Sequence, residues 1–321
     1  MKIKIIKTKF AGLRIGLMAG IITISGGSIA QAALDLFPGD SADYAVLYEG
    51  SGGHNLQINS SPLNGSTILG NVGLAMENGG NPQLQLNNPA VIDGDINFAQ
   101  TPANFHNSGG VVTGSVNGGI PQVQTDMTDI NALSQGLAGL PGTPLTINGN
   151  TTVEASTGIF DSTFDAYVFN LTSLNLGNGT TLTIDGQGLD ANVVINLSVA
   201  NISGPHFAGA IALTGGLTPN NAIINLTGGN YTTLTGGPTL QTAANHAEQD
   251  ITYINPTGNI GVNSVAIEGH LFGGDSSDMT INSGGTVQIV PEPGTIVLAT
   301  LGGLSMIVLR LRVRGKFRTT I

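Results

Sequence analysis

Short apolar runs recur along the middle of the chain, and each is closed by glycine, asparagine or aspartate. With the turn residue that closes them, the runs are about four to seven residues long and rich in Val, Ile, Thr and Phe; they include 145–149, 166–171, 180–186, 192–197, 222–228, 265–269, 278–282 and 286–289. β-Branched and aromatic residues favour strands, whereas Gly, Asn and Asp favour the turns between them. The pattern therefore predicts an all-β body.

Two architectures produce many short strands with regular turns, namely a sandwich and a solenoid of stacked coils. The tripeptide Ile-Asn-Leu occurs at 195–197 and 224–226 and is echoed by Phe-Asn-Leu at 169–171. Asparagines at equivalent positions of successive coils can form amide ladders, which favours the solenoid. A sandwich would need more large aromatic core residues than a chain with 5 % aromatics offers. No strict repeat period is present, so the sandwich stays as the alternative.

One segment has helical rather than strand periodicity. Between residues 125 and 140 the apolar side chains recur at a spacing of three or four, with an aspartate near the start and Gly and Pro near the end; they are Met127, Ile130, Leu133 and Leu137. We expect one α-helix, near 125–140, packed beside the solenoid. No change of composition divides residues 33–290, so we predict a single domain.

Charge is distributed very unevenly along the 321 residues. All ten Lys and Arg residues lie in the two ends, and residues 33–290 contain none. The same stretch holds 19 of the 20 carboxylates, since only Glu292 lies outside it, so its formal charge is −19. A body without basic side chains cannot neutralise phosphates, which excludes the usual binding of nucleic acid. The absence of Cys excludes disulfides and thiolate metal sites.

The first 32 residues have the order of a secretory signal. A basic stretch from Lys2 to Arg14 precedes an apolar run at 15–24 and the small-residue exit Ala30-Gln31-Ala32. We predict cleavage after Ala32, with Ala33 as the near alternative, and a Sec-type export machinery as partner. An uncleaved anchor helix is the competing interpretation, although the apolar run is shorter than the ~20 residues of a usual span.

A second signal is predicted at the other end. Residues 295–309 are apolar, and five basic residues follow them: Arg310, Arg312, Arg314, Lys316 and Arg318. At about 1.5 Å per residue the apolar helix spans about 23 Å, which flanking arginines can extend by reaching to the lipid headgroups. We therefore predict a C-terminal transmembrane helix whose basic cluster stays cytoplasmic.

This end resembles a known sorting signal. Pro291, Glu292 and Pro293, followed by an apolar helix and a terminal basic cluster, are similar to the PEP-CTERM tail of exosortase substrates. The resemblance covers residues 291–318, and the last three residues extend past the usual basic end. It implies an exosortase as partner, transient anchoring in the inner membrane, and final location at the cell surface or outside the cell.

The body has a looser resemblance, carried by turn-and-strand segments at 44–47, 92–98, 192–197 and 267–275. These segments resemble the choice-of-anchor A adhesin-like surface proteins. The resemblance implies a right-handed β-helix and a role in adhesion or matrix structure. It carries over no catalytic residues.

Candidate chemistry within the body is sparse. There is no Cys nucleophile and no Gly-x-Ser-x-Gly motif, so we predict that the protein is not an enzyme and needs no organic cofactor. Carboxylates in glycine-flanked turns suit Ca²⁺, and two such pairs are candidates: Asp93 with Asp95, and Asp275 with Asp278. His246, Glu248 and Asp250 alternate along a strand, which places them on one face; a solvated polar face is the favoured interpretation. The Thr-rich run at 180–183 is interpreted as strand surface.

The sequence thus predicts an exported structural or adhesive protein that contributes to an extracellular polysaccharide or biofilm matrix. A surface polysaccharide is the expected partner. The alternative is an ice- or carbohydrate-binding module, and the third candidate is a hydrolase acting on polysaccharide. A long flat face of Thr or stacked Asn would favour binding, whereas a cleft with carboxylates about 5–9 Å apart would favour hydrolysis.

Overall fold

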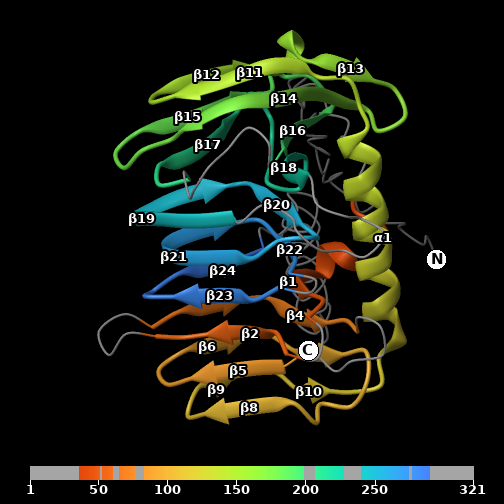
Figure 1. Ribbon diagram of the computed structural model, residues 1–321, viewed down its shortest axis with the longest axis vertical. Helices are drawn as coiled ribbons and strands as arrows, with labels where there is room; N and C mark the ends of the chain where they lie inside the picture. Colours follow the sequence, from red (N-terminus) through yellow and green to blue (C-terminus); the bar gives the residue numbers. More distant parts are fainter. Residues whose placement is uncertain are drawn as a thin grey trace, which may run out of the picture. The chain divides into compact units, whose positions relative to one another are not determined.

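The computed structural model describes residues 36–50, 53–60, 65–76, 83–198, 207–227, 240–274 and 277–289. In these residues parallel strands stack on one another in successive coils, and one α-helix lies along the outside (Figure 1). The predicted all-β class with a flanking helix is therefore confirmed. The sandwich alternative is wrong, because sandwich strands pair antiparallel whereas nearly all pairs here are parallel.

One sheet forms what we call the helix face, because the α-helix covers it. Its strands are, in spatial order, β10 (Val116–Asn117), β7 (Ile96–Phe98), β4 (Asn71–Leu74), β1 (Tyr44–Tyr48), β22 (Leu271–Gly273), β20 (Thr252–Asn255), β18 (Ala222–Thr227), β16 (Asn192–Ser198), β14 (Ala166–Asn175) and β11 (Thr143–Asn148). The short β13 (Ile159–Asp161) pairs antiparallel with β14. Two 3-10 turns, Ser41–Asp43 and Ala155–Thr157, complete the described helical elements.

The second sheet divides into two exposed faces at β21 (Ile260–Glu268). We call the first the amide face; it comprises residues 260–263 of β21, β23 (Met279–Asn282), β2 (Asn55–Ile58), β5 (Gln83–Asn87) and β8 (Phe105–Ser108). Ser264 has a φ of 51°, so the chain changes direction between the two halves of β21. This bend separates the two faces.

We call the other half of this sheet the acidic face. It comprises β12 (Thr151–Glu154), β15 (Thr181–Asp185), β17 (Ala210–Thr214), the end of β19 (Leu240–Asp250), residues 265–268 of β21, β24 (Thr286–Gln288), β3 (Thr67–Leu69), β6 (Val91–Asp93) and β9 (Val111–Val112). The side chains of β19 are described from residue 247 onward.

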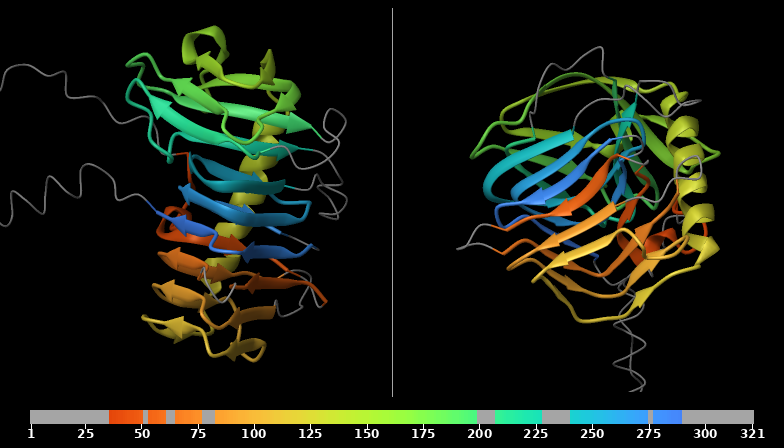
Figure 2. Two further views of the ribbon diagram at one scale, coloured as in Figure 1. Left: turned by 90° about the vertical axis from the view of Figure 1, so that its left-hand side faces the viewer. Right: turned by 60° about the horizontal axis from the view of Figure 1, so that its bottom comes forward.

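The coils do not follow one another in sequence order. The chain begins with β1 in the middle of the stack, proceeds to β8–β10 at one end, and returns along the outside as the α-helix (Figures 1 and 2). The coils from β11 onward then run from the opposite end back to the middle. There the last coil pairs with the first through β1·β22, β2·β23 and β3·β24. We call this contact between the first and last coils the joint.

The interior of the coils is filled by the inward residues of each strand. In β5, Leu84 and Leu86 are fully buried whereas Gln83, Gln85 and Asn87 point outward. Burying a side chain such as Leu stabilises the fold by about 1.5–3 kcal/mol. Because the strand period is two, each coil adds apolar groups to one continuous core and polar groups to the surface.

Helix α1 (Pro121–Ala138) packs on the helix face through the apolar stripe that the sequence predicted. Val123, Met127, Ile130, Leu133 and Leu137 are buried against outward residues of the sheet; these include Leu47, Val168, Val194, Ile223, Ile254 and Phe272. The predicted start at residue 125 is wrong by one turn, because Pro121 occupies the first turn, where its missing N–H is not needed. The helix ends at Ala138, before Gly139.

Stacked glycines make the corner between the acidic face and the helix face. A Cβ on Gly94 would lie 2.3 Å from the carbonyl oxygen of Gly70, and a Cβ on Gly114 would lie 2.4 Å from that of Gly94. Any side chain there would collide with the backbone of the coil beside it. Close stacking of the coils at this corner therefore depends on glycine.

The predicted asparagine ladder is present on the helix face. Asn225 donates from Nδ2 to Asn196 Oδ1 at 3.0 Å, and Asn196 donates from Nδ2 to Asn170 Oδ1 at 3.4 Å. The ladder also holds the helix, because Asn225 bonds Ser134 and Asn196 donates to the carbonyl of Leu137. The Ile-Asn-Leu repeat thus fastens α1 to the coils.

Candidate binding faces

Helix α1 covers one side of the solenoid, so the amide face and the acidic face are the two extended strand surfaces left open. On the amide face the outward side chains form rows that cross the strands. The central row contains Gly261, Thr280, Gln57, Gln85 and His106, and the next row contains Asn263, Asn282, Asn59, Asn87 and Ser108. Apart from His106, both rows consist of short or amide side chains in register.

Hydrogen bonds link the three middle members of the asparagine row of the amide face. Asn59 donates from Nδ2 to Asn282 Oδ1 at 2.9 Å, and Asn87 donates from Nδ2 to Asn59 Oδ1 at 2.6 Å. A second N–H of Asn59 reaches Gln57 Oε1 at 3.4 Å. Asn59 is therefore held from both sides, by Asn282 and by Asn87, and the same two bonds orient those neighbours.

The side chains of the central row form fewer hydrogen bonds. In the part of the chain that the structure describes, the side chains of Thr280, Gln85 and His106 form no hydrogen bond, and Gln57 only accepts from Asn59. A glutamine amide offers two N–H donors and an acceptor oxygen, and a threonine hydroxyl offers both roles. These groups remain available to a ligand.

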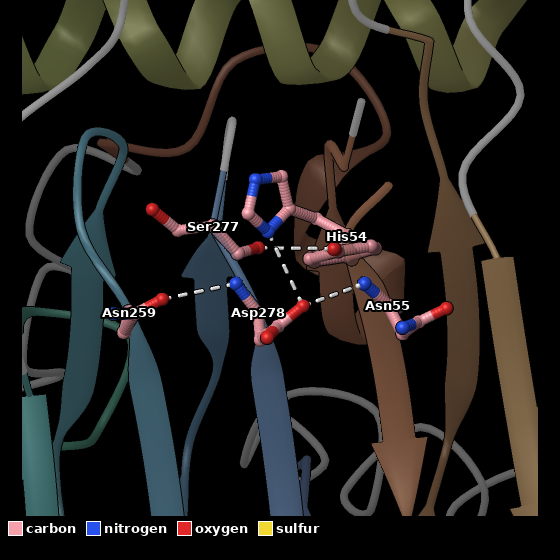
Figure 3. A network of polar contacts seen from close by, with 6 residues as sticks. His54, Asn55, Asn259, Ser277 and Asp278 are labelled. Atoms are coloured by element: carbon pink, nitrogen blue, oxygen red, sulfur yellow. Dashed lines mark hydrogen bonds and ion pairs between the residues drawn. The ribbon is translucent and has the colours of Figure 1, made fainter. Parts of the chain in front are cut away.

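Where β2 and β23 begin, at one edge of the amide face, side chains of the first and last coils are in contact. Asp278 accepts hydrogen bonds at Oδ1 from the backbone N–H of Asn55 at 2.9 Å and lies 3.3 Å from His54 Nδ1 (Figure 3). The backbone N–H of Asp278 donates to Asn259 Oδ1 at 3.0 Å, and Tyr48 donates to the carbonyl of Ser277. Most of these contacts join residues more than 220 positions apart, so they fasten the first coil to the last.

The acidic face has a different composition. One outward row contains Thr181, Ala210, Glu248, Ala266, Thr286, Thr67, Val91 and Val111; the next contains Thr152, Thr183, Ala212, Asp250, Glu268, Gln288, Leu69 and Asp93. Thr181 and Thr183, from the Thr-rich run, lie here as strand surface, as expected. Carboxylates interrupt both rows near their middle.

Three of these carboxylates lie together. Ligand oxygens of Glu248, Asp250 and Glu268 all lie within 4.8 Å of one another, and this is the one such group of three among the described residues. Asp250 stands directly opposite Glu268 on the adjacent strand. With no lysine or arginine in the body, none of these charges has a basic partner.

The surroundings raise the pKa of two of these groups. Burial raises the pKa of Asp250 first, and repulsion by Glu248 raises it further, against a hydrogen bond from the backbone of Leu213. Burial also raises the pKa of Glu268, and Glu248 and Asp250 add to the rise while Gln288 opposes it. Burial, reinforced by the repulsion of neighbouring carboxylates, therefore makes the ionised state unfavourable here.

The calcium candidates occupy turns and are not brought into one cluster. Asp93 accepts from the hydroxyl of Thr113 at 2.5 Å, and Asp95 accepts from the backbone N–H of Ser115 at 2.7 Å. Asp278 takes part in the joint, and Asp275 lies outside the described residues. Asp95 and Asp278 thus accept from backbone N–H groups and Asp93 from a side-chain hydroxyl, and calcium binding by these residues stays a prediction.

The predicted targeting residues lie outside the described ranges. These are Ala30 and Ala32 of the signal, Pro291, Glu292 and Pro293 of the sorting motif, and the basic residues from Arg310 to Arg318. Among the described residues no helix is long and apolar enough to span a membrane. The apolar segment 295–309 is not among them.

Sequence reasoning found part of the carboxylate cluster and missed the rest. The alternation of Glu248 and Asp250 in the sequence predicts that they lie on one face, whereas no sequence pattern connects Glu268 with them. Its place opposite Asp250 depends on the length of one coil, 18 residues at this point. A search for acidic residues separated by one coil length would have found it.

Comparisons with known proteins identify similar structures and no family. No family model matches the chain, and no curated protein matches it. An ice-binding protein from the Antarctic ascomycete Antarctomyces psychrotrophicus is 16% identical with a TM-score of 0.49, covering 81% of this chain and 100% of that chain.

Two further ice-binding proteins match at similar levels. One from an Antarctic biological consortium is 15% identical with a TM-score of 0.45, covering 80% of this chain and 92% of that chain. A glycosylated one from an Arctic yeast is 16% identical with a TM-score of 0.45, covering 82% of this chain and 98% of that chain.

Proposed function

We propose that this chain is an exported, non-catalytic binding protein that acts through an extended flat face of its solenoid, with ice or a carbohydrate as ligand. The observation that carries the proposal is the amide face, whose outward rows of asparagine, glutamine and threonine stay in register over successive coils. Ice and polysaccharides both present repeating hydroxyl or water groups, which such rows can bind at many points at once.

The chemistry of the exposed groups supports binding rather than turnover. Asn, Gln and Thr side chains donate and accept hydrogen bonds, and they are poor nucleophiles without an activating base. Glu248, Asp250 and Glu268 project side by side from two adjacent strands of one sheet face. The two carboxyls of a glycosidase instead stand on two sides of a bound sugar.

Two measurements on the full chain test this proposal. The protein is expected to slow the recrystallisation of ice or to sediment with insoluble polysaccharide, and an unrelated acidic protein of equal charge serves as control. If the chain does neither, the proposed function is wrong. Release of soluble sugar from the polysaccharide would instead identify a hydrolase.

A matrix or adhesive role is a second candidate, favoured by the resemblance of residues 291–318 to the PEP-CTERM tail. In this proposal, the signal at 1–32 directs export, an exosortase processes the tail at the inner membrane, and the body reaches the cell surface. Deleting residues 291–321 should then change the fraction in which the protein is found. An unchanged distribution would exclude sorting by the tail.

A further inference from the structure

We infer that the ligand of the amide face is a neutral, hydroxyl-rich polysaccharide, lying across the strands along the row of Thr280, Gln57, Gln85 and His106. This inference rests on the proposed function and specifies both its face and its ligand. It follows from the charge of the body, the hydrogen-bonding capacity of the row and the spacing of the strands.

Charge restricts the ligand first. The body carries 19 carboxylates and no lysine or arginine, so it repels anionic polymers as a whole. A cationic ligand would be drawn to the acidic face, where Glu248, Asp250 and Glu268 lie together. On the amide face the described outward rows are uncharged apart from Asp278 at the edge, which is already bonded to Asn55, and the histidines. A neutral ligand is the one that suits this face.

Hydrogen-bonding capacity restricts it further. The asparagine row satisfies itself through the bonds of Asn59 with Asn282 and Asn87. The adjacent row keeps free donors and acceptors on Thr280 and Gln85. A ligand for this row must therefore present hydrogen-bond donors and acceptors at regular intervals. Sugar hydroxyls meet this requirement because each can donate and accept.

Geometry sets the direction of the chain. Adjacent rungs of the row are about 4.8 Å apart, since they stand on neighbouring parallel strands. One sugar unit in an extended polysaccharide has a similar length, so successive sugars can meet successive rungs. Glutamine side chains are long and rotate about several bonds, which lets them adjust to ring hydroxyls. The same freedom is unfavourable for matching a rigid ice lattice, and ice is therefore the alternative that the experiment separates.

The test compares variants that add carboxylates, and the Gln→Glu changes do so without altering the size of the side chain. In Gln57→Glu/Gln85→Glu the row gains two carboxylates that cannot donate. In Gln135→Glu the same change is made on the exposed side of helix α1, and in Thr183→Glu a carboxylate is added to the acidic face. Melting temperatures of all variants establish that each is folded. The probes are cellulose, curdlan and starch granules as neutral polymers, and calcium-free alginate as an anionic polymer.

We expect the full chain to bind at least one neutral polymer and not alginate. The double variant should bind about tenfold more weakly, because the amide N–H donors of both glutamines are lost. Gln135→Glu and Thr183→Glu should bind like the unchanged chain. If binding is instead lost only in Thr183→Glu, or if alginate binds as well as the neutral polymers, the inference is overturned while the proposed function stands.

The remaining outcomes distinguish a failure of this inference from a failure of the proposed function. A chain that inhibits ice recrystallisation but binds none of the neutral polymers overturns the inference and leaves the proposed function intact. A chain that affects neither ice nor any polymer overturns both. Binding that the folded double variant retains in full overturns the assignment to this row.

Discussion

Every coil of the amide face also contributes residues to the acidic face, and the two faces share β21. They differ in how their outward side chains interact with one another. On the amide face Asn59 both donates to and accepts from its neighbours in the row. On the acidic face Asp250 and Glu268 stand opposite each other and both carry negative charge. Stacking of coils repeats the same side-chain interaction from strand to strand. Rows of amides therefore stabilise the stack by hydrogen bonds, whereas rows of carboxylates destabilise it by repulsion.

The helix face also carries a row of asparagines, the ladder through Asn225 and Asn196, and we expect its disruption to lower the stability most. Replacing Asn225 by Ala leaves Ser134 and Asn196 without their buried partner, since Asn225 is fully buried. We expect the free energy of unfolding to fall by about 2–4 kcal/mol, because unsatisfied buried groups cost about 1–3 kcal/mol each. Urea denaturation measures it.

The matched control is Asn59→Ala in the partly exposed row. Water can replace the lost partners there, so the decrease should stay below about 1 kcal/mol. Equal losses in the two variants would show that burial does not distinguish the two ladders.

Lowering the pH should stabilise the fold through the acidic face. The pKa values of Asp250 and Glu268 are raised by burial and by neighbouring carboxylates, and burial also raises the pKa of Asp126, a residue of helix α1. The folded state then binds more protons than the unfolded chain, so stability falls as pH rises through these raised pKa values. Melting temperature should therefore increase from pH 7 toward pH 5. A decrease over this range would contradict the assignment.

Glu268→Gln isolates one member of the cluster. Removing the charge opposite Asp250 should stabilise the fold by up to about 1 kcal/mol, which corresponds to about 2–4 °C in melting temperature. The same variant should weaken the pH dependence described above. Glu154→Gln, which removes a carboxylate outside the cluster of three, serves as control and should change the melting temperature less.

Salt should give the smallest effect. Screening shortens the range of repulsion between exposed carboxylates, so NaCl should raise the melting temperature of the unchanged chain more than that of Glu268→Gln. Calcium compared with NaCl at equal ionic strength tests the predicted sites at Asp93, Asp95 and Asp278. A calcium shift that persists in Asp93→Asn/Asp95→Asn would leave that pair without a role.

The sequence predicted the features that depend on local pattern. Strand runs such as 192–197 and 222–226, the apolar stripe of α1 and the ladder through Asn196 and Asn225 follow from periodicity two, periodicity near four and a repeated tripeptide. The register between distant segments was out of reach, because no local signal indicates that Val46 pairs with Leu271. The two exposed faces could not be predicted for the same reason. The neighbours of Glu268 and of Gln85 come from other coils and not from nearby positions in the sequence.

The joint has a consequence for the order in which the molecule is completed. The strand β1 is among the first to be synthesised, yet one of its edges is paired by β22, a segment more than 220 residues later. Contacts of such long sequence separation form slowly, since a large loop must close before they contribute. Until residues 271–288 arrive, the early coils expose an unpaired strand edge, and such edges recruit other chains. The last coil is therefore a closing element, and the period before it docks is when this protein is most exposed to aggregation.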